Sequence, residues 1–64
     1  MKNSLSITKR KHIVNIMIRL FKSYDSYNDV KDELRELHSC DLISDEQYNF
    51  ALEHWNTILN LYIN

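Results

Sequence analysis

The sequence predicts an all-α protein, either a small three-helix bundle or a helical hairpin with an added N-terminal helix. The 64 residues include no glycine and no proline, and the tight turns of β-hairpins depend on these residues. Apolar residues also recur at spacings of three and four along most of the chain, which is the period of an amphipathic helix. At this length we expect a single helical domain over residues 1–64.

The first two helices are expected near 9–24 and 27–38. Ser6 or Thr8 can cap the first helix, and Ser26, with Asp29 in an acidic first turn, can cap the second. The apolar face of the first helix is continuous and comprises Ile13, Ile16, Met17, Leu20, Phe21 and Tyr24. The apolar face of the second helix is thin and comprises Tyr27, Val30, Leu34 and Leu37.

A third helix is expected near 45–62, and its start carries the clearest local signal in the chain. Ser44 and Gln47 have the spacing of a capping box, in which each side chain bonds the backbone N–H of the other residue. Ile43 and Tyr48 stand where a hydrophobic staple places its two residues. The apolar face comprises Tyr48, Ala51, Leu52, Trp55, Ile58, Leu59 and Tyr62. We therefore expect one uninterrupted helix about 27 Å long.

The junction between the second and third helices contains two leucines, a turn, an isoleucine, a serine, acidic residues and then an aromatic residue. The residues in this pattern are Leu34, Leu37, Ile43, Ser44, Glu46 and Tyr48. Over about residues 34–59 the chain resembles the SHOCT type of short helical hairpin. Asp41 stands where that family usually has glycine, and the lysine-rich second helix of the family is missing. The resemblance implies a helix–turn–helix hairpin used in interactions, and no specific activity.

Charge is divided along the chain, although the net charge is only −1. Every charged residue up to position 22 is basic, whereas all nine acidic residues follow Tyr24. The basic part predicts either a solvated helix start that attracts the acidic helices, or phosphate contacts with nucleic acid. The candidates for nucleic-acid contact are Lys9, Arg10, Lys11, Arg19 and Lys22. The acidic part predicts either an ordinary solvated surface or a mimic of DNA that inhibits a DNA-binding protein.

Catalysis and metal binding are not expected. Structural zinc needs four ligands in recognisable pairs, and His38, Cys40 and His54 do not supply them. No glycine is present to build a phosphate loop or an oxyanion turn. We therefore expect no enzyme activity, no cofactor, no metal and no small-molecule substrate. The lone cysteine, the lack of a secretory signal and the lack of about 20 consecutive apolar residues favour a cytoplasmic protein that does not enter a membrane.

Apolar residues outnumber the positions that a three-helix unit of this size can bury. The surplus residues are Val14, Ile18, Phe50, Leu61 and Ile63. A short chain without disulfides is often supported by self-association, so we expect a homodimer. The interface candidates are Val14, Ile18, Phe50, Trp55, Leu61 and Tyr62, because large apolar and aromatic residues commonly anchor protein interfaces.

The function favoured by these observations is that of a small regulatory or adaptor protein that binds another protein. Seven isoleucines and seven asparagines are typical of AT-rich coding sequences, such as those of phages, plasmids or low-GC bacteria. This favours a regulator of that kind, including one related to transcription. Three alternatives stay open: a nucleic-acid-binding protein that uses the basic first helix, an acidic DNA-mimic inhibitor, and an assembly subunit that only self-associates.

Overall fold

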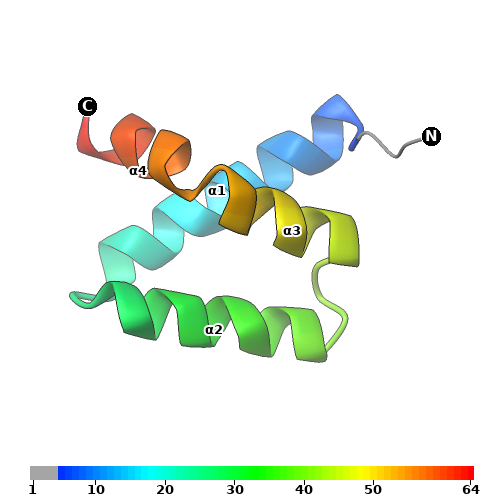
Figure 1. Cartoon of the computed structure of the whole chain (residues 1–64), viewed down its shortest axis with the longest axis horizontal. Coiled ribbons are helices and arrows are strands. Elements are labelled where there is room, and N and C mark those ends of the chain that lie inside the picture. Colours follow the sequence, from blue (N-terminus) through cyan, green and yellow to red (C-terminus); the bar gives the residue numbers. More distant parts are fainter. Residues whose placement is uncertain (1–4) are drawn as a thin grey trace.

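The helical periodicity of the sequence corresponds to four helices in the computed structural model, which describes residues 5–64 (Figure 1). Residues 5–64 contain no strand, so the prediction of an all-α fold is confirmed. None of the helices within this range is long and apolar enough to cross a membrane. The four helices are α1 (Ile7–Ser23), α2 (Tyr27–Ser39), α3 (Asp45–Glu53) and α4 (Trp55–Ile63).

Serine side chains begin three of these helices. Each serine hydroxyl accepts a hydrogen bond of 3.1 to 3.2 Å from a backbone N–H in the first turn. The first turn of a helix otherwise leaves such donors without a partner. The capping residues are Ser6 for α1, Ser26 for α2 and Ser44 for α3. Capping by Ser6 places the start of α1 at Ile7, two residues before the expected start.

The expected single helix over 45–62 is wrong, because the chain bends at His54 and forms α3 and α4 instead. The backbone angles of His54 are φ −106° and ψ 25°, outside the helical range. Two straight helices that cross touch only near the crossing point. The bend lets both α3 and α4 pack against α1. Figure 1 shows α3 and α4 lying one after the other across α1. Residues on both sides of the bend are therefore buried, including Ala51 and Ile58.

The hydrophobic core forms around α1, which packs against each of the other three helices. Three of its residues at spacings of four are buried, as the periodicity predicts. Full burial of one such side chain contributes about 1.5–3 kcal/mol, so this cluster is a large favourable contribution to the free energy of folding. The buried apolar residues are Ile13, Met17, Phe21, Val30, Leu34, Ile43, Ala51 and Ile58.

One polar side chain within residues 5–64, that of Gln47, is also buried. Its Oε1 accepts a hydrogen bond from the Ser44 N–H at 2.9 Å, while Ser44 Oγ accepts one from the Gln47 N–H. The predicted capping box is therefore confirmed. The Gln47 Nε2 also donates to the backbone carbonyl of Lys9 at 3.2 Å and lies 3.5 Å from His12 Nδ1. Gln47 thus joins the start of α3 to the first turns of α1.

The turn after α2 is a Schellman motif in which aspartate takes the place of glycine. The N–H of Leu42 donates to the carbonyl of Leu37 at 2.9 Å, and the N–H of Asp41 donates to that of His38 at 3.1 Å. Asp41 has a φ of 62°, which lies in the left-handed region that glycine occupies at little cost. The residue that departs from the SHOCT pattern is therefore the residue with this backbone strain.

Replacing Asp41 by glycine is expected to raise the free energy of unfolding by about 1 kcal/mol, because glycine has no Cβ to clash in this conformation. For a domain of this size that corresponds to a thermal midpoint higher by about 4–8 °C. Thermal unfolding followed by circular dichroism measures the change. The control is Asp41→Ala, which is expected to lower the midpoint, since alanine retains the Cβ and tolerates positive φ poorly. Equal midpoints for the two variants would contradict the argument.

Candidate protein-binding surface

Four aromatic rings from three helices meet where α1 ends and α2 begins, with Trp55 from the start of α4 and Tyr62 from its last turn. Phe21 lies at their centre, with ring centroids 6.1 Å from Tyr27, 5.2 Å from Trp55 and 5.8 Å from Tyr62. Tyr27 and Trp55 are 6.3 Å apart and nearly perpendicular. Such edge-to-face pairs add about 0.5–1.5 kcal/mol to the gain from burial. We call these four residues the aromatic cluster.

Only the centre of the aromatic cluster is shielded from solvent. Phe21 is 5% exposed, whereas Tyr27 is 53% exposed and Tyr62 is 37% exposed. Trp55 is half-buried, and the Nζ of Lys31 lies 5.2 Å from its ring centroid, within cation–π distance. The cluster therefore holds α2 and α4 on α1 with its inner ring and presents its outer rings to solvent.

The helix beside this cluster, α4, contains no charged residue. Its core side carries Ile58, yet Leu61 is 59% exposed and Ile63 is 64% exposed. These two positions lie about 160° apart around the helix, so apolar side chains flank Tyr62 on both edges of α4. We call the exposed parts of Tyr27, Trp55, Leu61, Tyr62 and Ile63 the α4 surface. A concentration of aromatic and aliphatic side chains without charge is typical of a protein-binding surface.

The structure divides the predicted interface residues into two groups. Trp55, Leu61 and Tyr62 lie on the α4 surface. Val14, Ile18 and Phe50 are half-buried and, like Trp55, pack against the core of their own chain. The place of these three residues in an interface stays a prediction.

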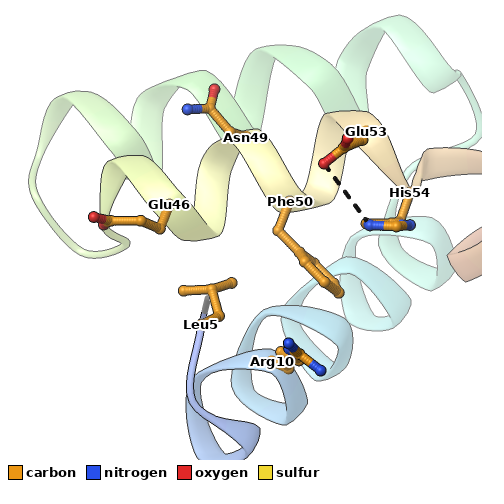
Figure 2. A pocket seen from close by; sticks show the side chains of 7 residues that line it. All are labelled: Leu5, Arg10, Glu46, Asn49, Phe50, Glu53 and His54. Atoms are coloured by element: carbon orange, nitrogen blue, oxygen red, sulfur yellow. Dashed lines mark ion pairs between the residues drawn. The ribbon is translucent and has the colours of Figure 1, made fainter. Parts of the chain in front are cut away.

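Phe50 forms the floor of a pocket of about 370 Å³ between α3 and the start of α1 (Figure 2). Figure 2 shows the ring pointing from α3 towards α1 beside His54, and the two ring centroids are 4.5 Å apart. Charges of both signs surround the ring: Arg10 on α1, and the His54–Glu53 ion pair at 3.8 Å. The pocket is polar around its rim and shallow, and Phe50 is only partly available to a partner there.

The candidates for nucleic-acid contact do not form one patch. Lys9, Arg10 and Lys11 are consecutive in α1, so they point about 100° apart, and Arg10 lines the pocket with Glu46. All five candidate side chains are exposed. Both ion pairs within residues 5–64 use histidines, His38 with Asp45 and His54 with Glu53. The expected pairing of basic residues with the acidic helices is therefore not found within that range.

Three of the basic residues nevertheless share one face. Lys11, Arg19 and Lys22 lie 8 and 11 residues apart, distances that return to a similar side of a helix. That side is opposite the buried Ile13 and Met17. The outer face of α1 therefore carries positive charge, and nucleic-acid binding by α1 stays a prediction.

The outer face of α2 carries the opposite charge. Four acidic residues line a shallow pocket of about 400 Å³ there together with Tyr24 and Arg35. The Tyr24 hydroxyl donates to Glu33 Oε1 at 3.4 Å. The negative charge of Glu33 raises the pKa of Tyr24 above its usual value, since removing the proton would place two negative charges side by side. The four acidic residues are Asp29, Asp32, Glu33 and Glu36.

His38, Cys40 and His54 are the residues considered as metal ligands or nucleophiles. Within residues 5–64, no three histidine, cysteine, aspartate or glutamate side chains lie close enough to hold a metal ion. His38 stacks on Tyr48 with centroids 4.4 Å apart, and its Nε2 lies 2.5 Å from Asp45 Oδ1. Cys40 is exposed in the turn after α2. His38 therefore has a structural role as a link between the end of α2 and the start of α3.

Comparisons of the chain with protein families, with curated proteins and with solved structures found no match. The resemblance to the SHOCT hairpin therefore stays a prediction.

Proposed function

We propose that this protein is a small regulatory protein or adaptor that forms a homodimer and binds another protein through the α4 surface. The observation that carries the proposal is the uncharged helix α4, which exposes Leu61 and Ile63 beside the outer rings of the aromatic cluster. Apolar area of this kind gains free energy when a partner removes it from water. Residues 55–64 contain no charged side chain that would have to lose its hydration on binding.

The composition of the α4 surface resembles that of the energetic centres of protein interfaces. Tryptophan and tyrosine are enriched among residues whose truncation costs more than about 2 kcal/mol in binding. The rings of Tyr27 and Trp55 are already held in place by Phe21, so little side-chain freedom is lost when a partner docks. The other exposed large aliphatic residues lie outside α4: Ile7 at the start of α1, Leu42 in the turn after α2 and Leu52 in α3.

Replacing both Leu61 and Ile63 by glutamine is expected to weaken partner binding by at least about tenfold, since binding would then leave polar groups against an apolar partner. Glutamine has a helix propensity close to that of leucine, so α4 should persist. Tagged wild-type and variant protein would be used to capture partners from the native host, followed by quantitative mass spectrometry. The same captured partner, made pure, would then be titrated to compare dissociation constants.

The matched control is the double variant Ile7→Gln/Leu42→Gln. Ile7 is 69% exposed and Leu42 is 65% exposed, so these changes remove a similar apolar area from other parts of the molecule. The proposal predicts that the control binds the partner as wild type does. If both variants capture the same proteins in the same amounts as wild type, the α4 surface is not the binding site.

A further inference from the structure

A groove with an apolar floor runs between α1 and α2. It has a volume of about 420 Å³, and its floor is formed by Ile16, Leu20 and Leu37, all of which are half-buried. It exposes more apolar than polar surface, unlike the pockets beside Phe50 and Tyr24. One copy of the chain therefore leaves an apolar strip open between its two longest helices.

Opposite charges stand on the two sides of this groove. Arg19 lines it from α1 and Glu33 lines it from α2. The two side chains do not form an ion pair with each other, because no arginine or lysine of residues 5–64 lies within 4.0 Å of a carboxylate of that range. Glu33 instead accepts a hydrogen bond from Tyr24. Each rim of the groove thus holds one charge that has no ionic partner within the described part of the chain.

We propose that the groove binds the same groove of a second copy of this chain. A two-fold axis running along the groove places α1 of one copy over α2 of the other. Because Arg19 and Glu33 line the same stretch of the groove, Arg19 of each copy then faces Glu33 of the second copy. Such an arrangement encloses the apolar floors of both copies between two symmetric ion pairs, in a bundle of four antiparallel helices.

The charges on the outer faces of α1 and α2 favour a second copy of the chain, rather than an unrelated helix, as the partner that binds the groove. The positive face of α1 comes near the negative face of α2 from the second copy, and the reverse holds on the other side of the axis. A core of eight buried apolar residues is small for an independent domain, and self-association is a common way to stabilise one. This inference rests on the homodimer in the proposed function, and it places the dimer contact away from the α4 surface.

Charge reversal tests the geometry. Wild-type protein in sedimentation equilibrium is expected to reach twice the 7.7 kDa mass of the chain. Arg19→Glu and Glu33→Arg each bring like charges together twice in the dimer, and each is expected to raise the dimer dissociation constant by about 100-fold. The double variant R19E/E33R restores both pairs in reverse, so its dissociation constant should return to within about tenfold of wild type.

The matched control is Lys9→Glu, which changes the net charge by the same amount on the same helix but lies outside the groove and away from the face of α1 formed by Lys11, Arg19 and Lys22. Its dissociation constant should stay close to that of wild type. A wild-type dimer that neither single reversal weakens, or a double variant that stays monomeric, would overturn the inference and leave the homodimer and the α4 surface standing. A wild-type chain that stays monomeric at all concentrations would overturn the inference and the homodimer together. Partner binding by the L61Q/I63Q variant is measured separately and reports on the α4 surface alone.

Discussion

Replacing Phe21 by alanine is expected to lower the free energy of unfolding by about 3–5 kcal/mol. Phe21 is 5% exposed and its ring touches three other aromatic rings, so the change leaves a cavity where α1, α2 and α4 meet. Natural domains are stable by only about 5–15 kcal/mol, and small ones lie near the lower limit. The variant should therefore melt at least about 12 °C below wild type, as thermal unfolding followed by circular dichroism measures.

Two further variants separate the cavity from the loss of the ring contacts. Phe21→Leu retains much of the volume and is expected to cost about 1–2 kcal/mol. Ile7→Ala shortens an exposed side chain at the start of α1 and should change the stability by no more than about 0.5 kcal/mol. A Phe21→Ala variant as stable as Ile7→Ala would show that the aromatic cluster does not hold the helices together.

Replacing Gln47 by glutamate is expected to lower the free energy of unfolding by about 2–3 kcal/mol at neutral pH. Glutamate has the same length and can still accept the hydrogen bond from the Ser44 N–H. It has no Nε2 to donate to the Lys9 carbonyl, which lies 3.2 Å away in the native chain, and its negative charge faces that oxygen. Comparison of urea unfolding curves for wild type and variant gives the difference.

This loss should depend on pH, and its direction follows from the protonation of the new carboxyl. Burial and the nearby carbonyl raise the folded-state pKa of a carboxyl at position 47 above its value in the unfolded chain, about 4.3. Above the folded-state pKa the destabilisation is therefore complete. It disappears as the pH falls below 4.3, where the protonated group donates to Lys9.

The control for this pH dependence is Gln47→Ala, which also removes the donor to the Lys9 carbonyl but has nothing to titrate. Its stability relative to wild type is expected to stay constant over the same pH range. A loss in Gln47→Glu that is equal at neutral and acid pH would show that the carboxyl is solvated, and that the link between Gln47 and α1 contributes little.

Local chemistry allowed much of the fold to be predicted. The caps at Ser26 and Ser44 depend on neighbouring residues, and the buried face of α1 depends on a spacing of four, so both can be derived without tertiary contacts. The bend at His54 could not, because kinks are usually marked by proline or glycine and this chain has neither. The bend follows from the way in which α3 and α4 both pack on α1.

The candidate sites, like the fold, include residues that local sequence predicts and contacts that depend on tertiary packing. Trp55, Leu61 and Tyr62 could be selected from the pattern of α4 alone. The contact of Tyr27 with Trp55 joins residues 28 positions apart, and no local pattern marks it. Gln47 was predicted as a capping residue, but its hydrogen bond to Lys9 spans 38 positions and depends on how α3 docks. Arg19 and Glu33 likewise come to the same groove only once α1 and α2 have packed.

The single tryptophan of the chain stands at the first position of α4, against Phe21 and beneath Lys31. The N-terminus of α4 has no side-chain cap, so this helix depends on its packing rather than on local hydrogen bonds to stay in place. Fluorescence from Trp55 therefore reports the docking of α4 on α1, whereas circular dichroism reports all four helices at once. The chain thus contains its own probe, without any label, for events that occur at one end of the molecule.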